Sequence, residues 1–161
     1  MDYYGVNIKD LVTGEGTPDL GTVGSPFGTL YGEATSAQWG DLAEKYVSKE
    51  QYERGTVISV SADPNFDVEM CNYDLCYSVV GIISTQPGFT MGDKLKDGQY
   101  VALTGLVPVK IFGAINKSDF IVATFNGCAR AGTPDEIGHK IGVANETNKN
   151  EGIKLVGCII K

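Results

Sequence analysis

Two acidic residues and one histidine are the first candidates for chemistry in this sequence. Asp41 and Glu44 are three residues apart in a segment where a helix is expected, so they would share one helix face and could form a general acid–base pair. Lys45 and Lys49 follow closely, and a solvated charged face is the stronger interpretation. His139, the one histidine of the chain, adjoins an expected strand, where a partly exposed structural role is commoner than a general base. The sequence therefore predicts no catalytic residue.

Four cysteines raise the question of metal binding or disulfides: Cys71, Cys76, Cys128 and Cys158. Cys71 and Cys76 are separated by four residues, which fits no common zinc spacing, and His139 is the one histidine that could complete such a site. Four cysteines in a chain of this length are also far fewer than a disulfide scaffold needs. We therefore expect reduced thiols that pack as small hydrophobic residues, with no metal and no cofactor.

Short glycine motifs and glycosylation sequons lack the context that would make them functional. Gly14-Glu15-Gly16 begins like a dinucleotide fingerprint, but no third glycine follows at the required spacing. The run from Gly24 to Gly28 lacks the residue that a nucleophile elbow places before its serine, and Pro26 would remove an oxyanion-hole N–H. The sequons at Asn116 and Asn145 follow no recognisable signal peptide. Neither a nucleotide-binding protein nor a serine hydrolase is predicted.

Charge and composition exclude further classes of function. The 161-residue chain has a formal net charge of −7, and its basic residues form no cluster, so we expect no nucleic-acid binding. No apolar run reaches the roughly 20 residues of a membrane-spanning helix, so we expect no membrane insertion. The apolar content of 42% is enough for a folded domain, and the 21 glycines predict many tight turns.

The chain divides into three expected parts. Residues 1–33 are rich in glycine and proline and poor in core residues, which indicates an extended stem that must pack against something outside itself, such as another chain. Residues 34–54 are expected to form a helical or turn connector, because Trp39, Leu42, Ala43 and Tyr46 recur at helical spacing. Residues 55–161 are expected to form a β domain.

The β domain is predicted from short β-branched runs between turn residues. The expected strands are 56–60, 79–84, 100–103, 106–112, 120–125, 128–131, 140–143 and 153–160. Asn126-Gly127 suits a two-residue hairpin, because both residues tolerate positive φ. Since no long helix separates the strands, we expect a mainly β fold with short antiparallel strands in a compact sandwich or small barrel.

The segment from Leu30 to Tyr46, with Asp41-Leu42-Ala43-Glu44 near its end, resembles a signature of bacteriophage tail-fibre and related virion appendage proteins. The similarity continues through Tyr52-Glu53-Arg54-Gly55-Thr56-Val57 and through the runs 80–87 and 101–110, and it covers roughly residues 19–161. A more distant similarity is to the self-cleaving chaperone domains of some phage appendage proteins, which carry an Asp-Tyr-Ala-Glu motif where Asp41-Leu42-Ala43-Glu44 stands here.

The resemblance implies a carboxy-terminal domain of a fibre, fibre tip or other virion appendage. Such domains are usually homotrimers whose glycine-rich strands intertwine, and their partners are other phage tail or virion proteins. We therefore expect a non-enzymatic structural protein located in the virion. Two alternatives stay open: an autoproteolytic chaperone domain that uses Asp41 or Glu44, and a receptor-binding tip that contacts the host surface through loops such as 63–74.

Overall fold

The computed structural model describes residues 40–92, 95 and 97–161. The expected stem, residues 1–33, lies outside the described residues, and so do residues 34–39 of the expected connector. The described chain is mainly β, as predicted, with these elements in order: β1 (Gly40–Tyr46), β2 (Val57–Val60), β3 (Val68–Met70), β4 (Val79–Ile83), β5 (Phe89–Met91), β6 (Gln99–Ile111), β7 (Phe120–Ala123), β8 (Ala129–Ala131), the 3₁₀ helix η1 (Pro134–His139), β9 (Lys140–Ala144) and β10 (Lys154–Ile160).

The helix expected over residues 34–46 is wrong for the part that the structure describes. Residues 40–46 form strand β1, which pairs antiparallel with β6 along its whole length, from Gly40 opposite Leu106 to Tyr46 opposite Gln99. The burial of the side chains also alternates as in a strand, because Asp41 and Ala43 are buried while Leu42 and Glu44 are half-buried. Tertiary pairing with β6 therefore overrides the weak helical preference of this segment, which Gly40 lowers further.

Five strands close into a small barrel at the carboxy-terminal end of the chain, confirming the barrel alternative of the sequence prediction. The order around it is β10-β9-β7-β8-β6, and β10 returns to β6 through the pairs from Lys154–Ile111 to Ile160–Gly105. A short parallel contact between β6 and β8, at Ile111 and Ala129, closes the ring. Closure leaves no free strand edge between these five strands.

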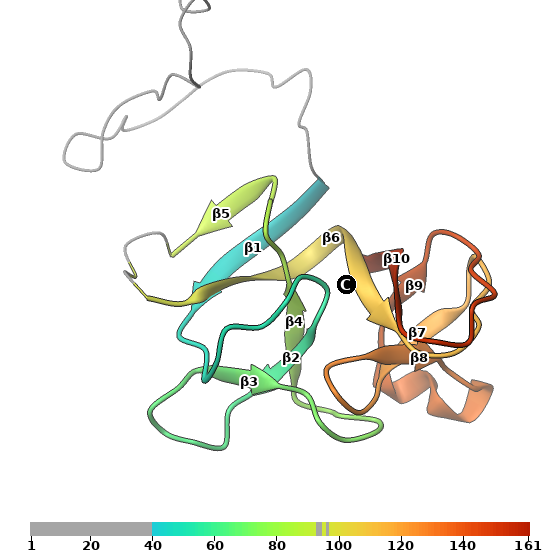
Figure 1. Ribbon diagram of the computed structural model, residues 1–161, viewed down its shortest axis with the longest axis horizontal. Helices are drawn as coiled ribbons and strands as arrows, with labels where there is room; N and C mark the ends of the chain where they lie inside the picture. Colours follow the sequence, from blue (N-terminus) through green and yellow to red (C-terminus); the bar gives the residue numbers. More distant parts are fainter. Residues whose placement is uncertain (1–39, 93–94, 96) are drawn as a thin grey trace, which may run out of the picture. The chain divides into compact units, whose positions relative to one another are not determined.

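The amino-terminal half of β6 belongs to a second group of strands (Figure 1), which includes β1, β4, β2 and β3. This group also closes, because the chain just after β1 reaches β3: Ser48 bridges Val68, and the Asp67 N–H donates to the Val47 carbonyl at 2.9 Å. β5 is added outside, parallel to β1. Most pairs are antiparallel, as predicted, and β1–β5 and β6–β8 are the two parallel exceptions among the named strands.

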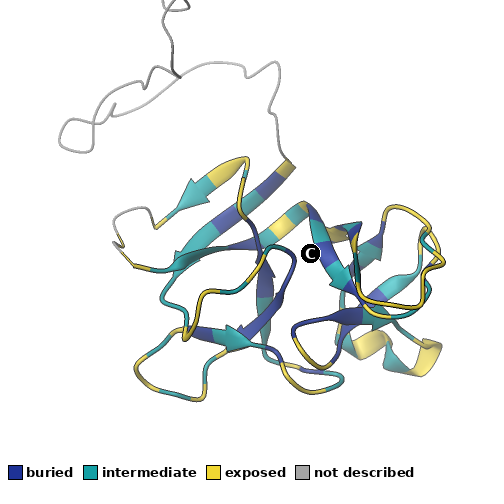
Figure 2. Ribbon diagram, viewed as in Figure 1, coloured by how far each residue is buried: buried dark blue, intermediate teal, exposed yellow. Residues whose placement is uncertain are grey.

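Strands β2, β4 and β6 lie between two hydrophobic cores, so neighbouring residues are buried on opposite faces. Figure 2 shows β2 and β4 mostly in the dark blue of buried residues. The larger core includes Val57, Ile82 and Ala102 together with the inward side chains of the carboxy-terminal barrel. The residues next to them belong to the smaller core, namely Ile58, Ile83 and Val101. Burial on both faces explains why these strands read as continuous apolar runs rather than alternating ones.

Glycine decides the geometry at two points. The strands expected at 100–103 and 106–112 are one long strand, β6, whose direction changes where Gly105 adopts φ 112°. The hairpin predicted at Asn126-Gly127 is confirmed, with φ of 58° and 64°, and it joins β7 to β8. β3 and β5 were not predicted, because three-residue strands carry too little periodic signal.

Candidate functional site

An apolar face lies on the outside of the barrel. It is formed by the outward side chains of the paired strands β6 and β10 and of the residues next to their ends. We call it the β6–β10 face, and it consists of Leu106, Pro108, Lys110, Phe112, Ile153, Leu155, Gly157 and Ile159. Register places Ile159 opposite Leu106, Gly157 opposite Pro108 and Leu155 opposite Lys110.

The large apolar side chains of this face are 42% to 58% exposed, although they sit on the best-paired strands of the fold. Their neighbours along each strand, such as Val107 and Val156, are fully buried inside the barrel. Strand geometry therefore presents apolar residues on both sides of this ladder. Exposed apolar patches of this kind mark interaction surfaces in soluble proteins.

The charged groups at the β6–β10 face are already partnered. Lys110 Nζ donates to Glu53 Oε2 at 2.8 Å, and the Gly157 N–H donates to Glu146 Oε1 at 2.7 Å. Lys154 donates to the carbonyl groups of Gly113 and Asn150. A partner that covers this face would therefore not leave these charges without a hydrogen-bond partner.

At one end the β6–β10 face opens into an apolar hollow of about 260 Å³, which Phe112, Phe125, Cys128 and Ile153 line together with Thr124 and Asn126. Phe125 stands next to the Asn126-Gly127 turn and is 56% exposed. The hairpin thus places an aromatic ring beside the ladder, which extends the apolar surface around the barrel end.

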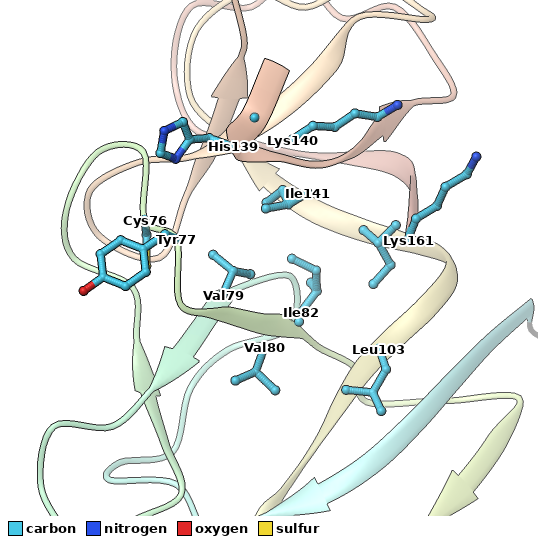
Figure 3. A pocket seen from close by; sticks show the side chains of 13 residues that line it. Cys76, Tyr77, Val79, Val80, Ile82, Leu103, His139, Lys140, Ile141 and Lys161 are labelled. Atoms are coloured by element: carbon cyan, nitrogen blue, oxygen red, sulfur yellow. The ribbon is translucent and has the colours of Figure 1, made fainter. Parts of the chain in front are cut away.

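A second cavity, of about 230 Å³, lies on another part of the domain, between β4, η1, β9 and the end of β10 (Figure 3). Val79, Ile82 and Ile141 form part of its apolar wall, and Cys76, Tyr77 and His139 lie together at one side. Its lining is mixed, and the described residues contain no group of three or more His, Cys, Asp or Glu that could hold a metal ion. The cavity lies next to the cysteine-bearing loop between β3 and β4.

An ion-pair cluster fixes that loop to the barrel. Arg130 on β8 donates to both carboxylate oxygens of Asp74, at 3.0 and 2.8 Å, and to both oxygens of Glu136 on η1, each at 2.8 Å. The guanidinium group and the Thr133 N–H hold the pKa of Glu136 down at about 2. Because every charge in the cluster is used in this bidentate pairing, its evident role is structural.

The structure separates the two carboxylates that the sequence placed on one helix face. Asp41 is 5% exposed, and its Oδ1 accepts a hydrogen bond from the Gly88 N–H at 3.0 Å. Glu44 instead accepts a hydrogen bond from the Tyr46 hydroxyl at 2.7 Å, and burial together with Glu44 raises the pKa of Tyr46 to about 12. The solvated charged face preferred for this segment is therefore wrong for Asp41, which is buried. The shared helix face on which an acid–base pair with Glu44 was considered does not form, because successive residues of a strand alternate between faces.

A buried oxygen of Asp41 and a buried nitrogen of His139 remain unexplained by the fold. Asp41 Oδ2 and His139 Nδ1 have no hydrogen-bond partner in the described chain. His139 is the last residue of η1, is partly exposed as predicted, and lines the cavity of Figure 3. All four cysteines are free and buried, as expected of thiols that pack as small hydrophobic residues.

The loops suggested for host contact carry exposed aromatic residues. Tyr73 and Tyr77 are both exposed, and their rings lie 6.4 Å apart at a tilt of 58°. Earlier in the same region, Asp63 Oδ1 accepts hydrogen bonds from the backbone N–H and the side-chain amide of Asn65, which hold the turn at this point. The structure thus gives loop 63–74 an ordered shape, but it assigns the loop no ligand.

The β6–β10 face was missed by the sequence reasoning, although the chain carries a signal for it. Strand β10 carries apolar residues at both odd and even positions, namely Leu155, Val156, Cys158, Ile159 and Ile160. One face of the strand can therefore enter the core while the other face stays outside. Such a pattern predicts either a second core or an exposed apolar face. Only the closed barrel, with its single interior, selects the second outcome.

Comparison with known proteins places this fold among those of bacteriophage proteins. The crystal structure of pre-mature bacteriophage phi29 gene product 12 matches with a TM-score of 0.60 and 13% identity over 80% of this chain, which spans 23% of that chain. A C-terminal fragment of the same phi29 gene product matches with a TM-score of 0.57 and 14% identity over 75% of this chain and 100% of the fragment. No family model and no curated protein matches the chain. At these identities the similarity is one of fold.

Among the described residues, no helix is long and apolar enough to cross a membrane.

Proposed function

We propose that this chain is a structural domain of a bacteriophage virion protein, such as a tail fibre, a fibre tip or a related appendage, and that it acts as a non-enzymatic homotrimer. Two lines of support lead here. The signature around Asp41-Leu42-Ala43-Glu44 resembles that of phage appendage proteins, and the fold matches a complete C-terminal fragment of a phage gene product. The exposed β6–β10 face is the observation that carries the assembly part of the proposal.

A second copy of this chain is the occupant that the β6–β10 face fits best. Each copy has a formal charge of −7, so self-association requires a contact face without unpaired acidic groups. The β6–β10 face meets this requirement, since Glu53 and Glu146 at its margin are engaged by Lys110 and by the Gly157 N–H. Gly40, where the described chain begins, pairs with Leu106 of the face.

The oligomer is tested with a charged substitution in the apolar β6–β10 face. Ile159→Lys should convert a trimer into smaller species, because burying an unpaired ammonium group costs several kcal/mol, roughly. Val60→Lys is the matched control, since Val60 is also an exposed apolar strand residue but lies on β2, outside the face. Light scattering of the full chain gives the masses. A monomeric unsubstituted protein, or equal effects of both variants, would contradict the proposal.

The virion role has its own test, which does not depend on the oligomeric state. Antibodies raised against residues 40–161 should label purified particles of the phage that carries this gene, at one defined appendage. Mass spectrometry of the same particles should recover peptides of this chain. Particles that contain no such peptide would exclude a virion component, whatever the association state of the isolated protein.

Self-processing is a second candidate function, which the unpartnered Asp41 Oδ2 favours. We nevertheless expect no cleavage. Cleavage of a peptide bond also needs a nucleophile and a hydrogen-bond donor for the developing oxyanion, both held in one geometry. In addition, Glu44 already accepts a hydrogen bond from the Tyr46 hydroxyl. The purified chain is incubated for days beside an Asp41→Asn, Glu44→Gln double variant while intact mass is followed. A fragment that appears in the unsubstituted chain alone would show that the chain cleaves itself.

A receptor-binding tip is the third candidate, supported by the exposed pair Tyr73 and Tyr77. Aromatic side chains at loop tips bind partners with large contact area and little loss of conformational freedom. A Tyr73→Ser, Tyr77→Ser double variant should then lose binding to cells of the phage's host. If the unsubstituted domain does not bind cells of the host, this candidate has no support.

A further inference from the structure

Two of the four buried cysteines lie at the two ends of one tight loop. Cys71 follows β3, and Cys76 precedes β4. Between them the chain turns through Leu75, which adopts φ 55° and donates its N–H to the Ala123 carbonyl at 3.0 Å. The backbone of Cys71 is held to Val57 and Gly127. The loop therefore brings Cys76 back toward a firmly placed Cys71.

The two thiols share a hydrogen-bond network. Cys76 Sγ lies 3.4 Å from Ser78 Oγ, and Ser78 Oγ lies 3.1 Å from the Tyr73 hydroxyl oxygen. Cys71 Sγ donates to the Tyr73 carbonyl at 3.6 Å, and both cysteines are buried in the same hydrophobic core. Tyr73 thus contacts Cys71 through its carbonyl and reaches Cys76 through its hydroxyl and Ser78.

The network distinguishes the two thiols chemically. Burial opposes ionisation of Cys76, but hydrogen bonds from Ser78, Tyr73 and Cys71 outweigh it and lower its pKa. Burial raises the pKa of Cys71 to about 12, so Cys71 keeps its proton and can donate it. Burial also raises the pKa of Cys128, and raises that of Cys158 to about 12. Thiolate character, which governs cysteine oxidation, is therefore concentrated at Cys76.

Access to Cys76 is provided by the cavity of about 230 Å³ that it lines with Tyr77 and His139 (Figure 3). A small neutral oxidant can enter a cavity of this size. Cys128 lines the other hollow, of about 260 Å³, so it has similar access. Its Sγ donates to the Asn126 carbonyl at 3.6 Å, and no hydrogen bond lowers its pKa. The chain therefore contains its own comparison between an accessible thiol with donors and an accessible thiol without them.

We propose that Cys71 and Cys76 form a redox-active dithiol, which a peroxide converts into an intramolecular disulfide. The Cys76 thiolate attacks one peroxide oxygen, the O–O bond breaks, and the departing hydroxide takes a proton to become water, which leaves Cys76 as a sulfenic acid. The Cys71 sulfur then attacks the Cys76 sulfur, the S–O bond breaks, and the hydroxide takes the Cys71 proton. In total, two thiols lose two electrons and two protons, and one hydrogen peroxide becomes two waters.

Such a bond would cross-link the loop that carries Tyr73, Asp74 and Tyr77. Because Asp74 is paired with Arg130 of the barrel, the cross-linked loop would be fixed at both its base and its middle. This consequence does not depend on the virion assignment. It adds a modification site to the β3–β4 loop.

The test treats the full folded chain with hydrogen peroxide and maps every cysteine by mass spectrometry after alkylation. Cys71 and Cys76 should be consumed together, about tenfold faster than Cys128 or Cys158, and should appear in one disulfide-linked peptide that a dithiol reductant restores. In Cys71→Ala, the sulfenic acid of Cys76 should persist and be trapped by dimedone. In Cys76→Ala, Cys71 should stay reduced.

The unsubstituted chain decides the question even if a variant fails to fold, because its disulfide map needs no substitution. Oxidation that begins at Cys128, a disulfide that joins any other pair, or four thiols that react equally would each overturn the inference. Circular dichroism before and after treatment confirms that the folded chain, rather than an unfolded one, was oxidised.

Discussion

At the scale of single residues, the Asn126-Gly127 turn shows how backbone geometry and packing combine. Both residues have positive φ, which suits the two-residue connection between β7 and β8. Gly127 also packs closely against Thr56 and Met70, which leave no room for a Cβ. Glycine is therefore required at this position both for its positive φ and for this close packing. Sequence reasoning found the first requirement from the dipeptide, whereas the second depends on segments more than fifty residues away.

Replacement of Gly127 by alanine should destabilise the domain by about 1–3 kcal/mol, because a Cβ would overlap Thr56 Cγ2 and lie 2.8 Å from Met70 Cγ. Urea unfolding followed by circular dichroism measures the loss. The matched control is Gly138→Ala, where a Cβ meets nothing within 4 Å, and it should change stability by less than about 0.5 kcal/mol. Equal effects of the two substitutions would contradict the packing argument.

The Arg130 cluster makes part of the stability depend on pH. The pKa of Glu136 falls from its ordinary 4.5 to about 2 in the folded chain, first because of Arg130 and then because of the Thr133 N–H. A carboxyl group whose pKa is lower in the folded chain than in the unfolded chain stabilises the fold at pH values above its unfolded-state pKa. This stabilisation is lost as the pH falls toward its folded-state pKa. The contribution of Glu136 should therefore be complete above pH 4.5 and disappear between 4.5 and 2.

Glu136→Gln should accordingly be less stable than the unsubstituted chain at pH 7, and the two should converge as the pH approaches 2. Urea midpoints at pH 7, 4 and 3 give the comparison, and substitution of the exposed Glu50 by glutamine serves as the control. A difference that stays constant over this range would mean that the carboxylate charge of Glu136 contributes nothing.

At the scale of elements, the long strand β6 is the central feature, because it belongs to both closed groups of strands. Gly105 makes this possible: its φ of 112° and its closeness to Gly40 and Asp41 allow β6 to change direction while it still pairs with β1 and β10. The sequence predicted two strands at this place, since Gly105 interrupts the β-branched run. The interruption is a bend within one strand.

Gly105→Ala should weaken the pairing of β1 with β6 and cost more than alanine at another positive-φ glycine. A Cβ at Gly105 would overlap the Gly40 carbonyl oxygen and lie 2.7 Å from Asp41 Cα, whereas at Gly113, with φ 80°, the nearest atom is 4.0 Å away. Gly113→Ala therefore reports the backbone strain alone, about 1 kcal/mol. Amide hydrogen exchange should show faster exchange in β1 for Gly105→Ala and unchanged exchange for Gly113→Ala.

At the scale of the whole molecule, both hydrophobic cores are built from residues of the described part, between Tyr46 and Ile160. The domain should therefore fold from its own contacts, while assembly depends on surfaces that the monomer leaves exposed. The β6–β10 face is such a surface on the barrel.

Removal of residues 1–32 should leave the β domain folded and lower its association state. Circular dichroism should keep its β spectrum with a cooperative thermal transition, because the described residues by themselves provide two hydrophobic cores. Light scattering should report a smaller assembly, since the removed segment is expected to make contacts with neighbouring chains. An unfolded truncated protein would contradict the division into stem and domain.

The sequence by itself determined the class of fold, most strands from Val57 onward and the Asn126-Gly127 hairpin, because each follows from local periodicity, turn chemistry or composition. The tertiary structure alone decided that residues 40–46 are a strand, since their partner on β6 is some sixty residues away. It also decided which face of β10 is exposed and that Ser78 and Tyr73 surround Cys76. These features depend on barrel closure and loop conformation, which bring together residues that no local pattern relates.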